Sequence, residues 1–106
     1  DNENIINVIL KPHTTWSSYK EILINVCLNI KKLDIDVLVI AFGGDTFYLD
    51  PDTSSLSSFL LKLEDYEEMG SIIKEHIIDI PIIVTQEGGY DMDNIGIIAT
   101  NFLKKL

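Results

Sequence analysis

Two pairs of glycines in this chain each follow an apolar run and each precede a side chain that can do chemistry. One pair (43–44) precedes Asp45, and the other (88–89) precedes Tyr90. An ionised carboxylate can bind a hard or borderline cation such as Zn²⁺, and a phenol can donate a hydrogen bond to an oxyanion that forms beside a Lewis-acidic metal. Together they would support metal-assisted attack of water on a carbonyl. The same pattern also fits a simpler interpretation, in which Asp45 and Asp50 are turn residues and Tyr90 is a half-buried aromatic.

The order of the expected elements predicts where these side chains lie. Short apolar runs rich in β-branched residues indicate strands, and apolar positions at helical spacing indicate helices. The order βαβαβα predicts a parallel sheet with helices packed on its faces. In the expected strand at 36–42, the uninterrupted apolar run that follows Asp36 also predicts a central strand that is buried on both faces. The expected elements are a strand at 5–10, a helix at 19–33, a strand at 36–42, a helix at 64–78, a strand at 81–87 and a helix at 94–106.

The predicted sheet brings the two candidate residues to one edge. In open α/β sheets, ligands bind outside the carboxyl ends of the strands, where loops converge. The strands at 36–42 and 81–87 both end there in glycine pairs, and glycine allows a sharp turn and a close approach by another group. We therefore expect Asp45 and Tyr90 to emerge on the same rim. The polar stretch 43–58 is long for a connection, and such loops are usually functional or disordered.

Composition excludes several classes of partner. The 106 residues suffice for one domain with a core. A formal net charge of -9 argues against direct nucleic-acid binding, because phosphate recognition needs clustered basic side chains. The chain has no apolar run of roughly 18 residues and no signal-peptide pattern, so we expect no membrane association. The single cysteine, Cys27, excludes an internal disulfide and fits a reducing, intracellular compartment, either cytoplasmic or nuclear.

Several segments resemble one known family in the order that the family has them. The segments GGDTFYLDP (43–51) and QEGGY (86–90) resemble two signature loops of the zinc-dependent deacetylase superfamily. This superfamily includes histone deacetylases and acetylpolyamine amidohydrolases and shares its fold with arginase. The flanking segments NVILKPHTTWSSYKEIL (7–23) and EDYEEMG (64–70) agree. The resemblance covers nearly the whole chain and implies a three-layer α/β/α fold with a parallel sheet, present here as a partial domain. The details DTF and QEGGY lean slightly toward the acetylpolyamine and class II-like branch of the superfamily.

The resemblance also implies a role for each matching residue. Asp45 would be a ligand of Zn²⁺, or of the Fe²⁺ that can replace it, as the second aspartate of an Asp-His-Asp set. Tyr90 would polarise the acetyl carbonyl and stabilise the oxyanion. Gly88 and Gly89 would line the channel that holds the acylated side chain. Asp50, at the family's Asp-Pro step, would shape the loop.

Part of the family's machinery is missing from this chain. It contains neither the His-His pair that the family uses for proton transfer nor the Asp-x-His that supplies two more zinc ligands. Its histidines, His13 in a predicted turn and His76 on a predicted helix, match no functional position. Because catalytic zinc normally takes three protein ligands, we expect the chain alone to be inactive. We expect residues 1–106 to be the C-terminal portion of a single histone-deacetylase-like domain, whose upstream part supplies the missing motifs.

Three functions remain open at this point. The first is part of a zinc-dependent amidohydrolase that deacetylates acetyl-lysine, in a histone or another protein, or an acetylpolyamine. The second is a catalytically silent deacetylase-like α/β module that acts in protein binding or regulation. The third, a phosphate- or nucleotide-binding domain, is disfavoured because neither G-x-G-x-x-G nor G-x-x-x-x-G-K-[ST] occurs. If the domain is partial, the isolated segment should expose unpaired strand edges and self-associate.

Overall fold

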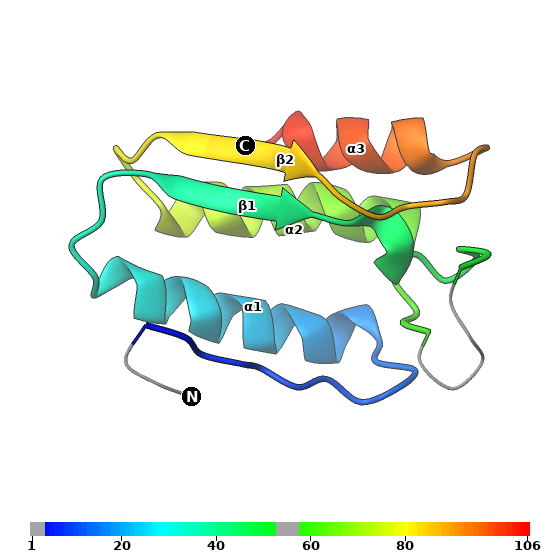
Figure 1. Ribbon diagram of the computed structural model, residues 1–106, viewed down its shortest axis with the longest axis horizontal. Coiled ribbons are helices and arrows are strands. Elements are labelled where there is room, and N and C mark those ends of the chain that lie inside the picture. Colours follow the sequence, from blue (N-terminus) through cyan, green and yellow to red (C-terminus); the bar gives the residue numbers. More distant parts are fainter. Residues whose placement is uncertain (1–3, 53–57) are drawn as a thin grey trace.

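A computed structural model of the chain describes residues 4–52 and 58–106 (Figure 1). Most of the polar stretch 43–58 that the sequence singles out is therefore visible, but its residues 53–57 lie outside the described part. No helix among the described residues is long and apolar enough to cross a membrane. The elements are α1 (Trp16–Lys31), β1 (Leu38–Phe42), the short 3-10 helix η1 (Gly44–Thr46), α2 (Leu63–His76), β2 (Ile82–Gln86) and α3 (Ile95–Leu103).

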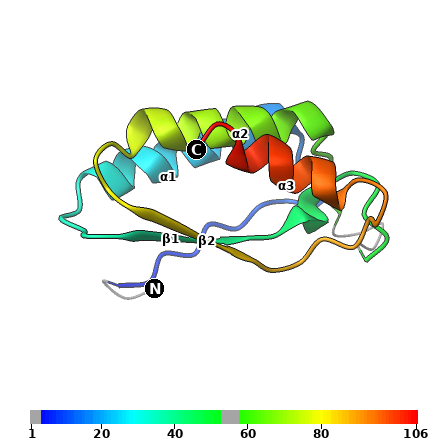
Figure 2. The same cartoon turned by 90° about the horizontal axis from the view of Figure 1, so that it is seen from above.

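The strands β1 and β2 pair in parallel, as the sequence predicts. Their register runs from Leu38 beside Ile82 to Phe42 beside Gln86, so both strands end at the same edge. All three helices lie on one face of this sheet (Figure 2). The described residues thus form two layers of an α/β fold, in agreement with a partial α/β/α domain.

The other face of the sheet is open, which differs from the expectation that the strand at 36–42 is buried on both sides. Val39 is 60% exposed and Ile83 is 53% exposed. Alternate side chains of a strand point to opposite faces, so these residues point away from the helices. Their exposure has a simple cause: among the described residues, no element covers this face.

The predicted strand at 5–10 is wrong for this chain. The segment is extended, but it pairs with no strand of the described residues. In the view of Figure 1 it runs along α1, on the side away from β1. Its apolar side chains are largely in solvent, with Ile6 73% and Ile9 91% exposed. A strand needs a neighbour to accept and donate its backbone hydrogen bonds, and here that neighbour is lacking.

The hydrophobic core lies between the sheet and its helices. The ring of Phe42 stacks on that of Phe102, with centroids 4.2 Å apart, and this contact joins β1 to α3. Gly70 lets α2 approach α3, because a Cβ at this position would lie 2.3 Å from the carbonyl oxygen of Phe102. The buried apolar residues are Cys27, Phe42, Phe47, Leu61, Tyr66, Met69, Ile72, Ile73, Ile77, Ile98 and Phe102.

Candidate functional site

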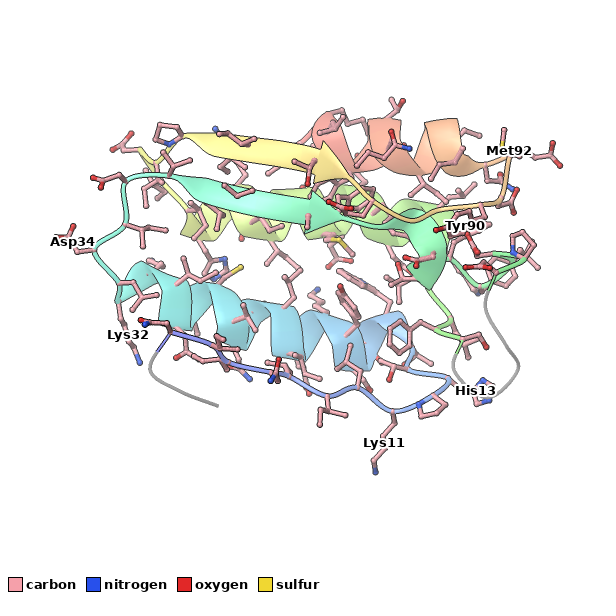
Figure 3. All side chains as sticks on the ribbon, viewed as in Figure 1. Lys11, His13, Lys32, Asp34, Tyr90 and Met92 are labelled. Carbon is pink, nitrogen blue, oxygen red and sulfur yellow. The ribbon has the colours of Figure 1, made fainter. Side chains whose placement is uncertain are left out.

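The loops that follow β1 and β2 are joined through their main chains at the carboxyl edge of the sheet. The amide of Glu87 donates to the carbonyl oxygen of Phe42 at 2.7 Å, and the amide of Gly44 donates to that of Gly88, also at 2.7 Å. These bonds continue the ladder of the two strands beyond their ends. The loop that carries Asp45 and the loop that carries Tyr90 therefore form one rim, and Figure 3 shows Tyr90 at this end of the molecule.

The carboxylate of Asp45 lies between two glycines, one from each loop. A Cβ on Gly43 would lie 2.7 Å from Oδ1 of Asp45, and a Cβ on Gly88 would lie 2.7 Å from its Oδ2. Both distances are shorter than real Cβ contacts allow, so any larger residue would displace the carboxylate. The glycines create the space that this carboxylate occupies.

The other two glycines of the rim pack against each other. Gly89 has φ +132°, a conformation that residues with a side chain rarely adopt. A Cβ at this position would also lie 3.2 Å from the Cα and the amide nitrogen of Gly44. Gly88 and Gly89 were predicted to line a substrate channel, and the described contacts give them a role in bringing the two loops together. The channel itself stays a prediction.

Asp45 is held on the short helix η1, while its carboxylate has no hydrogen-bond or ion-pair partner among the described residues. The neighbouring hydroxyls of Thr46 and Tyr66 are hydrogen-bonded at 2.8 Å, and Phe47 is buried, so η1 is fixed on both sides of the chain. Burial of Tyr66 raises the pKa of its phenol. Among the described residues, no hydrogen bond or ion pair involves the half-buried carboxylate of Asp45. Its oxygens are therefore available to a ligand.

Tyr90 is held through its backbone rather than through its side chain. Its amide donates to Oδ2 of Asp50 at 2.7 Å, whereas its side chain is half exposed and its hydroxyl has no hydrogen-bond partner among the described residues. Asp50 is only 4% exposed. The sequence indicated a loop-shaping role for Asp50 but not this contact, and the only local signal was its position in the Asp-Pro step.

The rim contains part of a metal site at most. Within the described ranges, no group of three His, Cys, Asp or Glu side chains is placed so that it could hold a metal ion. His13 lies in a turn with φ +62°, as predicted. The Nδ1 atom of His76 lies 2.7 Å from the carbonyl oxygen of Ile72, one turn earlier in α2. His13 thus forms part of a turn, and His76 contacts the backbone of its own helix.

Relatives of known identity match this chain along nearly its whole length. The histone deacetylase domain family matches residues 1–106. Acetylpolyamine amidohydrolase 1 of Pseudomonas aeruginosa is 36% identical over 89 residues, which is 84% of this chain and 24% of that protein. Acetylpolyamine amidohydrolase of Mycoplana ramosa is 34% identical over 91 residues, covering 86% of this chain and 25% of that protein.

A solved structure supports the same fold. The acetylpolyamine aminohydrolase of Burkholderia pseudomallei superposes with a TM-score of 0.82 at 20% identity, covering 94% of this chain and 28% of that one. The protein is thus part of an α/β fold shared with such enzymes. The chain belongs to the histone deacetylase domain family, and it spans about a quarter of the length of the curated relatives it matches.

Proposed function

We propose that these residues form the C-terminal part of a metal-dependent deacetylase domain that hydrolyses the acetyl amide of an acetylpolyamine or of acetyl-lysine. One observation carries the proposal: the carboxylate of Asp45, which has no hydrogen-bond partner among the described residues, lies between Gly43 and Gly88 on the same rim as Tyr90. The family and its relatives supply the reaction class. The whole protein is the longest natural polypeptide that contains these 106 residues.

Asp45 is proposed as a metal ligand. Carboxylate oxygens are ligands of Zn²⁺ and of other divalent metals, and the arrangement of Asp45 leaves its oxygens unused. The remaining ligands have to come from outside the described residues, and we assign them to an upstream part that carries the His-His and Asp-x-His motifs. The metal, Zn²⁺ or Fe²⁺, would polarise the acetyl carbonyl and lower the pKa of the attacking water.

Tyr90 is proposed as the hydrogen-bond donor to the acetyl oxygen. A preorganised donor is most effective where negative charge develops during the reaction, and the hydroxyl of Tyr90 makes no competing internal bond among the described residues. Gly88 and Gly89, which precede it, would let an aliphatic stem pass close to the backbone. The rim would then hold an acetyl group between the carboxylate of Asp45 and the phenol of Tyr90.

The open sheet supports the proposal of a partial domain. The face that carries Val39 and Ile83 is uncovered, and the extended segment with Ile9 has no strand beside it. Strands and helices from the upstream part would cover both. A parallel sheet is normally covered on its two faces, so the exposed surfaces are those expected of a domain seen without its remainder.

The proposed substrate is an acetylated polyamine first and acetyl-lysine second. The relatives named above are acetylpolyamine amidohydrolases, and the net charge of -9 favours a cationic substrate. Both candidates present an amide at the end of an aliphatic stem. The proposed location is inside the cell, in the cytoplasm or the nucleus, because a single unpaired cysteine, Cys27, fits a reducing compartment.

Hydrolysis assays on the zinc-loaded whole protein test this function. N-acetylputrescine and an acetyl-lysine peptide serve as the two substrates. Asp45→Asn should abolish turnover of the preferred one, and Tyr90→Phe should lower kcat about 100- to 1,000-fold, as for loss of an oxyanion donor. Asp52→Asn and Tyr48→Phe, exposed residues of the same loop, are matched controls and should leave the rate unchanged. A wild-type protein that turns over neither substrate and binds no metal would overturn the proposal in favour of a silent module.

A further inference from the structure

Asp50 connects the two loops of the rim through a buried carboxylate. Its Oδ2 accepts the amide of Tyr90 at 2.7 Å, between residues 40 positions apart, and its Oδ1 accepts the amide of Asp52 at 2.9 Å. The side chain is 4% exposed. Hydrogen bonds from amides to a carboxylate are stronger than those between neutral groups. The carboxylate of Asp50 thus closes a local turn with Asp52 and also holds the backbone amide of Tyr90.

The chain before Tyr90 needs such an anchor. Two glycines precede it, and Gly89 has φ +132°, so this stretch of backbone has few side-chain contacts to hold it. The phenol of Tyr90 is 49% exposed and its hydroxyl is not hydrogen-bonded within the described residues. The position of the hydroxyl therefore depends on where its backbone is held. The hydrogen bond from the backbone amide of Tyr90 to the carboxylate of Asp50 holds the backbone at this point.

We propose that Asp50 is a positioning residue that holds the hydroxyl of Tyr90 in place for the reaction. The inference rests on the proposed function, in which Tyr90 is the donor to the acetyl oxygen. A carboxylate accepts at both of its oxygens, whereas the amide of asparagine offers one acceptor and one donor. Asp50→Asn therefore cannot accept from the amides of both Asp52 and Tyr90 at once, while it keeps the size of the side chain. Because a misplacement of about 1 Å can cost about 100-fold in rate, kcat should fall 10- to 100-fold, with KM nearly unchanged.

The test is a double-mutant cycle in the zinc-loaded whole protein. Four forms are compared: wild type, Asp50→Asn, Tyr90→Phe and the double variant, with Asp52→Asn as the charge-matched control from the same loop. If Asp50 acts through the hydroxyl of Tyr90, Asp50→Asn lowers kcat in the wild-type background and has little further effect in Tyr90→Phe. Equal effects of Asp50→Asn in both backgrounds would overturn the proposal. Metal content should be the same in all four forms.

Hydrogen exchange supplies a readout that needs no activity and no variant. In the wild-type protein, the amide of Tyr90 should exchange at least about 10-fold more slowly than that of Met92, which is exposed and lies two residues further on. Equal exchange rates would overturn the proposal even if Asp50→Asn does not fold. If the wild type deacetylates neither substrate, the proposed function falls and the catalytic role of Asp50 with it. If wild type is active and Tyr90→Phe is not, but the cycle is additive, only the positioning role falls.

Discussion

The rim and the N-terminal segment of this chain are built in opposite ways. At the rim, the loops after β1 and β2 share main-chain hydrogen bonds, four glycines let their backbones touch, and the buried carboxylate of Asp50 ties one loop to the other. At the N-terminus, an extended segment runs beside α1 with Ile9 almost wholly in solvent. Within the described residues, the rim is held together by contacts of its own loops, whereas the N-terminal segment pairs with no strand.

This difference indicates how the proposed active site is divided within the domain. The positions of Asp45 and Tyr90 depend on residues of this chain, so the geometry between these two loops is set locally. The proposed further metal ligands and the proposed cover of the sheet would come from residues outside this chain. Changes at the rim should therefore affect chemistry, and changes at the N-terminal segment should affect assembly and stability.

The largest effect is expected from Gly88→Ala. Its Cβ would lie 2.7 Å from Oδ2 of Asp45, and the displaced carboxylate should no longer bind metal in the required position. We expect zinc content to fall and deacetylation to drop about 100-fold or more, measured on the zinc-loaded whole protein. Gly96→Ala in α3 is the matched control, because a Cβ there meets nothing within 4 Å. Full activity of Gly88→Ala would show that the rim is looser than its contacts indicate.

Gly70→Ala separates packing from helix propensity. In a solvated helix this change would stabilise by up to about 1 kcal/mol, but a Cβ on Gly70 would lie 2.3 Å from the carbonyl oxygen of Phe102. Pushing α2 and α3 apart should cost about 1–3 kcal/mol and lower the thermal midpoint of the whole protein. Gly96→Ala should raise that midpoint slightly. A stabilised Gly70→Ala protein would contradict the close approach of the two helices.

Ile9→Asn tests the unpartnered N-terminal segment in two contexts. In the isolated 106-residue chain Ile9 is 91% exposed, so the substitution should leave stability unchanged and weaken the self-association that we expect of this chain in sedimentation. In the whole protein, covered by upstream elements, the same change should cost about 1.5–3 kcal/mol. An isolated chain that sediments as a monomer at all concentrations would contradict the partial-domain account.

The smallest effect concerns Glu68, which joins α1 to α2. Its carboxylate accepts from Lys20, with which it forms an ion pair, and from Nε1 of Trp16 at 2.7 Å. These bonds, first that from Lys20, lower the pKa of Glu68. A carboxylate whose pKa is lowered on folding stabilises the folded protein at pH values above its ordinary pKa. This stabilisation is lost as the pH falls through the lowered pKa of the folded state.

Glu68→Gln should therefore destabilise the whole protein at pH 7 by less than about 1 kcal/mol, since the pair is partly exposed. The difference from wild type should shrink below about pH 4.3, the ordinary pKa of glutamate. Thermal unfolding at several pH values measures it. A difference that grows toward acid would contradict the assignment.

Local sequence patterns predicted most of the helices and strands and the two loops that carry Asp45 and Tyr90. The three helices and the strands β1 and β2 follow from apolar spacing that needs no partner to be recognised. The strand at 5–10 did not form because the described residues offer it no strand to pair with, and no pattern within the segment reveals that. The exposure of Val39 has the same cause, since an apolar run predicts burial only where a covering layer exists.

Long-range contacts could not be predicted from spacing. The bond between Asp50 and the amide of Tyr90 joins positions 40 residues apart, and the tight passage at Gly70 depends on where α3 crosses α2. The residue types alone indicate common local roles: Asp50 fits an aspartate in a turn, and Gly70 fits a weak helix former. Only the packing of distant segments distinguishes these roles from the ones that the structure gives.

Anomalous diffraction at the zinc edge, from crystals of the whole protein, tests the central claim most directly. If Asp45 is a metal ligand, we expect a single strong peak about 2.0–2.2 Å from one of its carboxylate oxygens, with the hydroxyl of Tyr90 directed toward the same space. The Asp45→Asn protein should lack the peak. A catalytically competent protein whose metal lies away from Asp45 would contradict the account.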